Sequence, residues 1–330
     1  MSILLRRLTA RAHAVVPAAP FHPLSRFVYA VGAVWMVVLT VYFNLSEFRL
    51  GYSLAYYAVG MFGYAVLSAV LARRYGMPRI ATFIESVMVL PFIGTMMLAS
   101  TAIMARHSSA FIDPLLRASD RALGFDWLQL FAVHQRHPGM MRSLDLAYAS
   151  LLEQIIIVPV LTALFAGERK LWQLLTAWVL AYLVTISIFP FATAAGPMSG
   201  YGITPAMVPE LTSTWQWQFA PLIAKLRSGE IMEMSQCILG IVQFPSFHAA
   251  AAVMLGWAGW QLRWWGAPLV VLNALMLFAT LINGDHYLTD VLAGCAIAVG
   301  SLWGAGRLIG WQAGRLADAS PPPPLIPAVS

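Results

Sequence analysis

Repeated apolar runs of about 20 residues constrain this chain more than any other feature of its sequence. A helix needs about 20 consecutive apolar residues to cross the hydrocarbon core of a bilayer. Such runs occur at roughly 27–43, 54–72, 82–104, 145–166, 172–190, 246–264, 267–283 and 287–306. Only 10% of the 330 residues are charged, whereas a soluble domain carries about 25%. The sequence therefore predicts an all-α polytopic membrane protein with about eight transmembrane helices.

Basic residues predict the orientation of these helices, because cytoplasmic loops of membrane proteins are enriched in Lys and Arg. With the N-terminus inside, the cytoplasmic loops hold most of the 20 Lys and Arg residues. They are Arg6, Arg7, Arg11, Arg26, Arg73, Arg74, Arg79, Arg169, Lys170, Arg263, Arg307 and Arg315. We therefore interpret the net charge of +6 as a record of topology and expect no nucleic-acid partner. The expected location is a bacterial inner membrane, with both termini cytoplasmic.

The predicted spans divide the chain into five segments. Residues 1–26 form a basic cytoplasmic segment, and 27–104 hold three transmembrane helices. Residues 105–144 are predicted to be an amphipathic interfacial segment on the outer side. Its apolar side chains suit the headgroup level: Leu115, Leu116, Leu123, Phe125, Trp127, Leu128 and Phe131. Residues 145–306 form a membrane core, and 307–330 form a proline-rich cytoplasmic tail.

Two acidic residues, Glu85 and Glu153, lie within predicted spans, and Gln154 follows the second. An ionisable group inside a membrane is costly and needs an internal partner. We expect these groups to form hydrogen bonds between helices.

Two histidines stand where a predicted span begins at the outer face. His248 lies in "FPSFHAA" and His286 in "NGDHYLTDVLAG". Two membrane crossings separate them, so both are expected at the same interface. Ser246 is a good N-cap for the first helix, and Asp285 is predicted to cap the helix that carries His286. The backbone N–H groups at two such helix ends would favour an anion.

Asp290 follows His286 by four residues, which places both on one face of a helix. Its carboxylate would accept a hydrogen bond from His286 Nδ1 and leave Nε2 free as a nucleophile or base. A metal site is not expected, because His134 and His137 in "HQRHPG" have no Cys or acidic residue close by.

"FPSFHAA" and "HYLTDVLAG" together resemble the second and third motifs, PSGH and SRxxxxxHxxxD, of the type 2 phosphatidic acid phosphatase superfamily. The likeness is greatest to its Aur-type branch of inositolphosphotransferases, the inositol phosphorylceramide synthases. The resemblance implies that about the last five helices form the catalytic bundle. It implies that His286 attacks phosphorus to give a phosphohistidine, oriented by Asp290. His248 would protonate the leaving oxygen and then activate the acceptor, without a metal or other cofactor.

The cations that hold phosphate in this superfamily are absent from their usual positions. Thr280 stands where the third motif has arginine, and Ala279 where it has serine. The stretch "FPFATAAGPMSGYG" replaces the first motif, KxxxxxxRP, without Lys or Arg. The phosphate-binding residues expected here are therefore Ser246, Gly196, Lys225, Arg227 and Thr280.

The expected activity is phosphoryl transfer from a lipid or polyprenyl phosphate at the periplasmic face. Water as the acceptor would make the protein a phosphatase of phosphatidic acid or a polyprenyl diphosphate. Inositol or a lipid hydroxyl would make it a phosphotransferase. Two alternatives remain: a proton-coupled transporter that uses the His286–Asp290 pair, and an inactive relative.

Overall fold

The computed structural model describes residues 21–209, 215–237 and 240–318. The predicted N-terminal segment up to residue 20 and the tail beyond residue 318 lie outside these ranges. Within them the chain is helical, and its β-structure is limited to one isolated bridge between Arg49 and Glu233.

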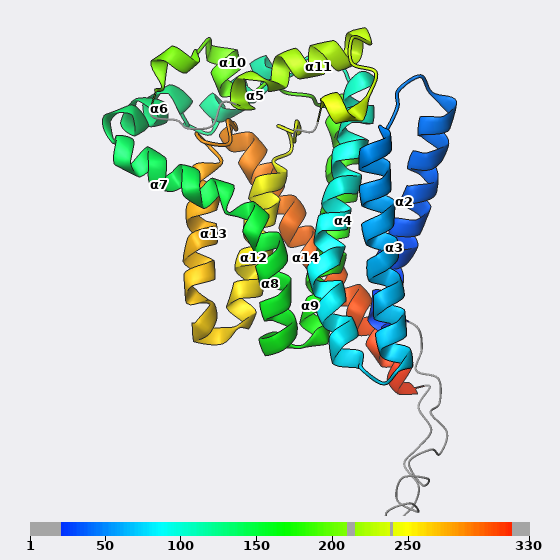
Figure 1. Ribbon diagram of the computed structural model, residues 1–330. Coiled ribbons are helices and arrows are strands. Elements are labelled where there is room, and N and C mark those ends of the chain that lie inside the picture. Colours follow the sequence, from blue (N-terminus) through cyan, green and yellow to red (C-terminus); the bar gives the residue numbers. More distant parts are fainter. Residues whose placement is uncertain (1–20, 210–214, 238–239, 319–330) are drawn as a thin grey trace, which may run out of the picture.

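The long helices stand side by side, and short helices cross one end of the bundle (Figure 1). The upright helices are α2 (Arg26–Leu45), α3 (Tyr52–Arg74), α4 (Pro78–Arg106), α8 (Leu151–Leu161), α9 (Glu168–Ile188), α12 (Phe247–Gln261), α13 (Ala267–Ala279) and α14 (Leu288–Asp318). The crossing helices are α5 (Asp113–Ala122), α6 (Trp127–Arg136), α7 (Pro138–Ala149), α10 (Pro197–Tyr201) and α11 (Phe219–Ser228). These crossing helices form a polar cap over one end of the bundle, and we call that end the capped end.

Four helical stretches in the described ranges are long and apolar enough to cross a membrane: Pro23–Leu45, Pro78–Arg106, Glu168–Phe191 and Leu288–Leu316. A fifth is obtained if the bent pair Pro138–Ala149 and Leu151–Ala166 counts as one span. The predicted number of eight is therefore not confirmed. Helices α12 and α13 have only 15 and 13 residues. They are short because the chain leaves the helical conformation where it forms the polar loops at the capped end.

The predicted span 145–166 is divided in the structure. Residues up to Ala149 belong to α7, and α8 begins at Leu151 after a bend of 52°. Of the α7 residues within this predicted span, Ala147 and Tyr148 are buried and Leu146 is exposed. Part of this apolar stretch therefore packs inside the protein.

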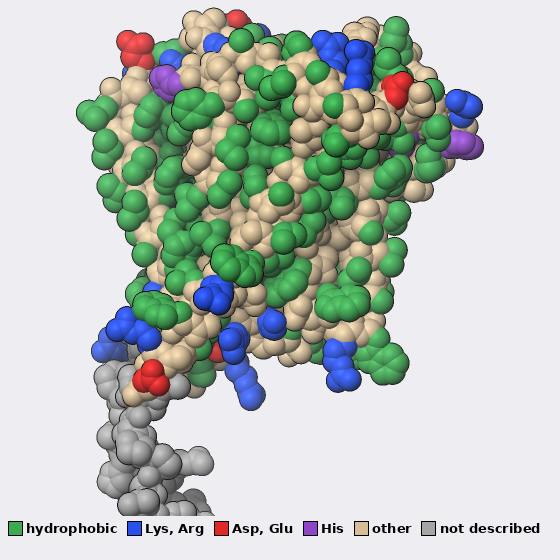
Figure 2. Space-filling view, turned by 180° about the vertical axis from the view of Figure 1, so that it is seen from behind, with side chains coloured by type: hydrophobic (Ala, Val, Ile, Leu, Met, Phe, Trp, Pro, Cys, Tyr) green, Lys and Arg blue, Asp and Glu red, His purple; other side chains and the backbone are tan. Residues whose placement is uncertain are grey.

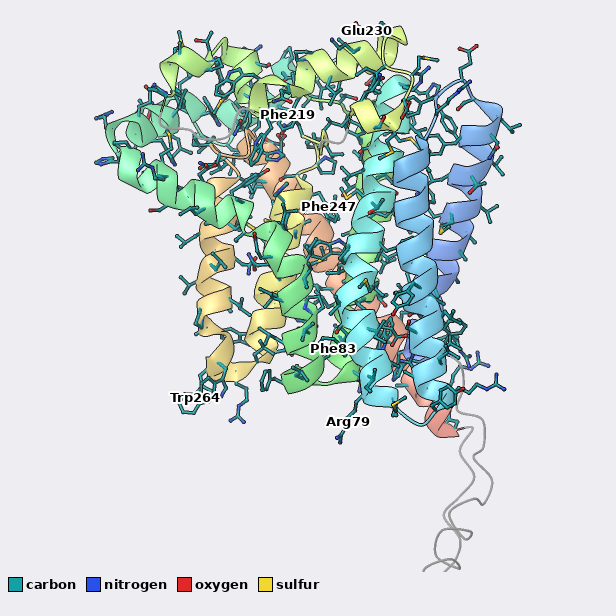
Figure 3. The ribbon with its side chains drawn as sticks, viewed as in Figure 1. Arg79, Phe83, Phe219, Glu230, Phe247 and Trp264 are labelled. Atoms are coloured by element: carbon teal, nitrogen blue, oxygen red, sulfur yellow. The ribbon has the colours of Figure 1, made fainter. Side chains whose placement is uncertain are left out.

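The surface of the upright helices is apolar over its middle, and basic side chains gather near the lower rim (Figure 2). Arg79 and Trp264 lie at this lower end, opposite Glu230 at the capped end (Figure 3). Long apolar helices with a charged rim indicate an integral membrane protein.

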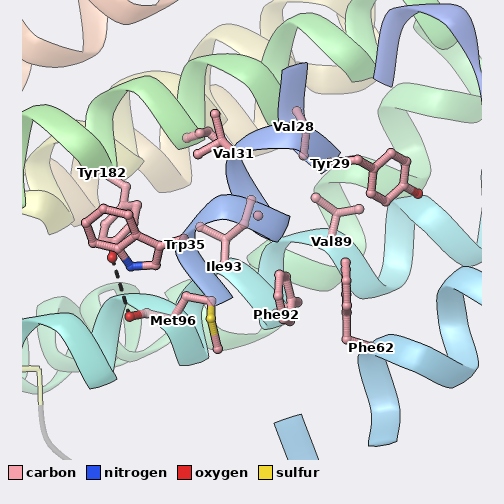
Figure 4. A pocket seen from close by; sticks show the side chains of 12 residues that line it. Val28, Tyr29, Val31, Trp35, Phe62, Val89, Phe92, Ile93, Met96 and Tyr182 are labelled. Carbon is pink, nitrogen blue, oxygen red and sulfur yellow. Dashed lines mark hydrogen bonds between the residues drawn. The ribbon is translucent and has the colours of Figure 1, made fainter. Parts of the chain in front are cut away.

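Helix α2 packs against α4 and α9 around a small apolar hollow (Figure 4). Polar atoms here are paired: Ser100 Oγ lies 2.7 Å from Trp35 Nε1 and 2.6 Å from Tyr182 Oη. A buried polar group without such a partner would be costly. These bonds join the first membrane helix to the rest of the bundle.

The two acidic residues within the predicted spans differ in burial and in hydrogen bonding. Glu85 is buried, forms a two-pronged ion pair with Arg73, and accepts a hydrogen bond of 2.7 Å from Tyr29. Gln154 accepts a bond of 2.7 Å from Asn273. Internal bonding is thus confirmed for Glu85 and Gln154. It is wrong for Glu153, whose side chain is exposed on the first turn of α8.

Glu85→Ala should destabilise the protein strongly, because it leaves Arg73 buried without a counter-charge. We expect a loss of about 3–5 kcal/mol, measured as thermal unfolding of the purified protein in detergent. Glu153→Ala is the matched control and should change stability by less than about 0.5 kcal/mol. Equal effects of the two substitutions would contradict the structural role of the ion pair.

Candidate active site

The two predicted motifs meet at the capped end of the bundle. Ser246 precedes α12, and its Oγ lies 3.2 Å from His286 Nε2. The Ser246 backbone N–H donates to the Asp290 carbonyl over 3.1 Å. The start of α12, marked by Phe247 in Figure 3, lies beneath α11. Ser246 also caps α12, because its Oγ accepts from Ala249 N at 3.2 Å. The predicted N-cap is therefore confirmed.

Asp290 lies against His286, but the predicted geometry was wrong. Helix α14 begins at Leu288, so His286 precedes it and the two residues do not share a helical face. The chain instead folds back, and Asp290 Oδ2 accepts from Tyr287 N at 3.0 Å. This brings Oδ2 to 3.5 Å from His286 Nδ1. That separation is just longer than a normal hydrogen bond, so the carboxylate lies behind the ring and leaves Nε2 facing Ser246.

Asp285 does not cap α14, contrary to the prediction. Its backbone adopts φ 58°, and its Oδ1 accepts from Met198 N at 2.6 Å, in the first turn of α10. The Oδ2 atom is buried without a hydrogen-bond partner among the described residues. The Asp285 carboxylate therefore links the first turn of α10 to the loop that carries His286.

Two buried carboxylates of α5 complete this framework, and the sequence analysis missed them. Asp113 accepts from Ala195 N and Gly196 N, each at 2.9 Å. Asp120 accepts from Leu288 N and Thr289 N, each at 2.9 Å, and so caps α14. The N–H groups at the start of α14, where phosphate was expected to bind, are thus already paired with Asp120. A sequence signal existed: Asp113 and Asp120 are seven residues apart, or two helical turns, on one face.

Segment 105–144 exposes some of the apolar side chains expected at the headgroup level and buries others. Leu115, Leu123 and Leu128 are exposed. Leu116, Trp127 and Phe131 are buried, and Trp127 Nε1 donates to Leu281 O over 2.7 Å. The segment therefore covers the loop around His286, with its acidic face inward.

The predicted phosphate-binding residues are only partly brought together. Gly196 adopts φ 97° beside Asp285, where a Cβ would overlap the carboxylate. Thr280 is buried, but its Oγ1 donates to Leu277 O in its own helix. Lys225 pairs with Glu230 at 2.9 Å on the surface of α11. Arg227 donates to Ser108 and Ser109. These last contacts direct both cations to the outer surface of the cap instead of toward His286.

A different cation, Arg117 of α5, contacts α10, which packs against the loop that carries His286. Its Nη1 donates to Gly200 O over 3.0 Å, and its guanidinium lies 5.4 Å from the Tyr201 ring centre. Gly200 lies against the Tyr287 hydroxyl, which donates to Asp113 over 3.2 Å. Arg117 was missed because it belongs to the segment interpreted as an interfacial helix.

Histidine 248 faces a tyrosine that the sequence did not single out. Its imidazole stacks on Tyr148 of α7, with ring centroids 4.3 Å apart and planes 15° from parallel. His248 is partly exposed, whereas His286, Asp290 and Ser246 are fully buried. The arrangement therefore offers one enclosed imidazole beside one accessible imidazole. Among the described residues, no group of three or more His, Cys, Asp or Glu side chains is arranged to hold a metal ion.

Burial lowers the pKa of His286, which lies between α13 and α14, to about 3, and nearby His248 lowers it further. The ring is therefore neutral near pH 7, with one ring nitrogen unprotonated. The unfolded chain takes up this proton near pH 6.5, so folding stability should fall as pH drops from 6.5 toward 3. Between pH 7 and pH 5 the loss from this residue is about 2 kcal/mol.

His286→Gln should remove this contribution to the fall in folding stability, because glutamine does not titrate. Thermal unfolding at pH 7 and at pH 5 measures the change. Folding stability should decrease less between these two pH values in His286→Gln than in the parent protein. His137→Gln, at an exposed histidine, is the control and should match the parent. Identical decreases in all three proteins would contradict a neutral, buried His286.

Comparison with known families agrees with this geometry. The family model described as the PAP2 superfamily matches residues 114–304, a range that includes His248, His286 and Asp290. No curated protein and no solved structure matches the chain. Because the match covers more than half of the 330 residues, the chain belongs to the PAP2 superfamily.

Proposed function

We propose that this protein transfers phosphoryl groups from a lipid or polyprenyl phosphate through a phosphohistidine on His286. The observation that carries the proposal is the placement of His286, with Nε2 at 3.2 Å from Ser246 Oγ and Asp290 behind Nδ1. A nucleophile with an orienting carboxylate, close to a second ionisable group, is the arrangement that covalent catalysis requires.

The reaction has two steps. In the first, the Nε2 lone pair of His286 forms a P–N bond while the ester P–O bond breaks. The electron pair of that bond goes to the leaving oxygen, which takes a proton from His248. In the second step, the oxygen of water or an alcohol forms a new P–O bond and gives its proton to His248. The P–N bond breaks and returns its electron pair to His286. Ser246 Oγ is close enough to donate to a phosphoryl oxygen in both steps.

The acceptor decides between a phosphatase and a phosphotransferase, and we propose the inositolphosphotransferase-like reaction on the likeness of the two motifs. Phosphatase action on phosphatidic acid or a polyprenyl diphosphate is the alternative. A panel of labelled lipid phosphates, incubated with and without inositol or a lipid alcohol, separates the two. An alcohol-dependent phosphorylated product supports transfer, whereas release of inorganic phosphate alone supports hydrolysis.

The reaction needs no metal or other cofactor, and the capped end faces the periplasm of a bacterial-type inner membrane. The second part of this proposal depends on the basic loops at the opposite end of the bundle. A transporter that relays protons through His286 and Asp290 would instead give proton flux in liposomes, lost in Asp290→Asn, and no phosphate turnover.

His286→Ala should abolish the covalent intermediate. We expect base-stable, acid-labile labelling of the parent protein by a labelled lipid phosphate, no labelling of His286→Ala, and a fall in kcat of at least about 10³-fold. Parent activity should survive EDTA. His137→Gln is the control and should be labelled normally. Labelling of His286→Ala, or loss of parent activity in EDTA, would contradict the mechanism.

Arg117 should supply part of the charge that the missing family cations provide elsewhere. Arg117→Gln is expected to raise KM for the lipid phosphate about tenfold or more, because a hydrogen bond to a charged group contributes about 1.5–3 kcal/mol. Arg121→Gln is the matched control, since Arg121 is exposed one turn further along α5. Steady-state kinetics gives KM for the lipid phosphate in both variants. Equal KM values in Arg117→Gln and Arg121→Gln would exclude a role of Arg117 in binding phosphate.

A further inference from the structure

We propose that Tyr148 is a positioning residue for His248, and that the contact between their ring faces fixes the direction in which His248 transfers its proton. This inference rests on the proposed function, because it takes His248 as the general acid and base. Tyr148 lies outside both sequence motifs, in a helix that the span count assigned partly to the membrane.

The two histidines are held in different ways. His286 has Ser246 at one ring nitrogen and Asp290 near the other. For His248, no hydrogen bond to a ring nitrogen is found among the described residues, and its ring contact is the stack on Tyr148. The centroid distance of 4.3 Å and the angle of 15° correspond to a stacked pair.

A face contact suits the role of His248 better than a hydrogen bond would. A residue that first donates a proton to a leaving oxygen and then accepts one from water or an alcohol needs an accessible ring nitrogen. A carboxylate partner would occupy one nitrogen and raise the cost of turning the ring. Stacking restrains the plane of the imidazole and leaves both nitrogens free for substrate.

The surrounding fold holds Tyr148 firmly. Its side chain is only 5% exposed, and it lies at the end of α7, just before the 52° bend into α8. The Trp215 ring packs on it with centroids 5.6 Å apart. Gly284 contacts it on the loop before His286, where an added Cβ would come within 2.7 Å of the tyrosine ring. Tyr148 therefore contacts the His286 loop as well as the His248 ring, and sets the spacing of the two.

The choice of leaving group makes the proposal testable. An alkoxide leaving group needs a proton from His248, whereas p-nitrophenolate departs without one. The measured quantity is kcat/KM, which reports the P–O cleavage step and not the second step that both substrates share. Tyr148→Leu removes the ring face and should lower kcat/KM for dioctanoyl phosphatidic acid, or the fastest alkyl phosphate ester of the lipid panel, about 10–100-fold. The same variant should change kcat/KM for p-nitrophenyl phosphate by less than about threefold. Tyr148→Phe keeps the ring face and should retain near-parental kcat/KM with both substrates.

Two controls separate this role from a general packing effect. Tyr182→Leu removes another buried tyrosine, far along the chain in α9, and should alter both substrates in parallel. His248→Ala should show the same leaving-group dependence as Tyr148→Leu, only larger. If Tyr148→Leu affects both substrates equally, or neither, the positioning role is wrong. If His248→Ala itself shows no leaving-group dependence, the acid role in the proposed function fails as well.

Discussion

The site depends on carboxylates that accept backbone N–H groups. Asp113, Asp120 and Asp285 bind the N–H groups at the starts of α10 and α14, and Asp290 binds that of Tyr287. The bonds from Asp113, Asp120 and Asp285 each join segments at least 82 residues apart in the sequence, whereas the bond from Asp290 closes a local turn. A carboxylate that accepts from two N–H groups in a buried place forms charge-assisted bonds, which are stronger than neutral ones. Helix α5 thereby fixes the loop on which His286 is carried.

This framework explains how a site of this family can form without its usual basic residues. The space beside Gly196, in the stretch that replaces the family's first motif, is filled by the Asp285 carboxylate. Asp113 accepts from the Gly196 N–H, so two carboxylates contact this glycine. Positive charge near the site comes from α5, through Arg117, which the motifs do not include. A phosphate held here would therefore contact a crossing helix as well as the membrane bundle.

The sequence predicted the helical class, the meeting of the two motifs at one end, and the Ser246 cap. These follow from hydrophobic runs and local capping rules, which act over a few residues. It failed where contacts between distant segments decide the structure. Asp285 binds α10 instead of α14, and Asp290 reaches His286 through a turn instead of a helical face. The buried faces of α5 and α7 were taken for membrane-facing surface, because apolarity alone does not distinguish lipid from protein as a neighbour.

The shortness of α12 and α13 determines the depth of the site. At 1.5 Å per residue, the 13 residues of α13 rise about 20 Å, whereas the hydrocarbon core of a bilayer is about 30 Å thick. In a bilayer that α4 crosses with its 29 residues, at least one end of α13 would therefore lie within the hydrocarbon core. Such a mismatch is relieved by local thinning of the bilayer. Beside α13, lipid headgroups would sink toward the histidines, so that a phosphate ester could meet the site while its acyl chains remain in the membrane.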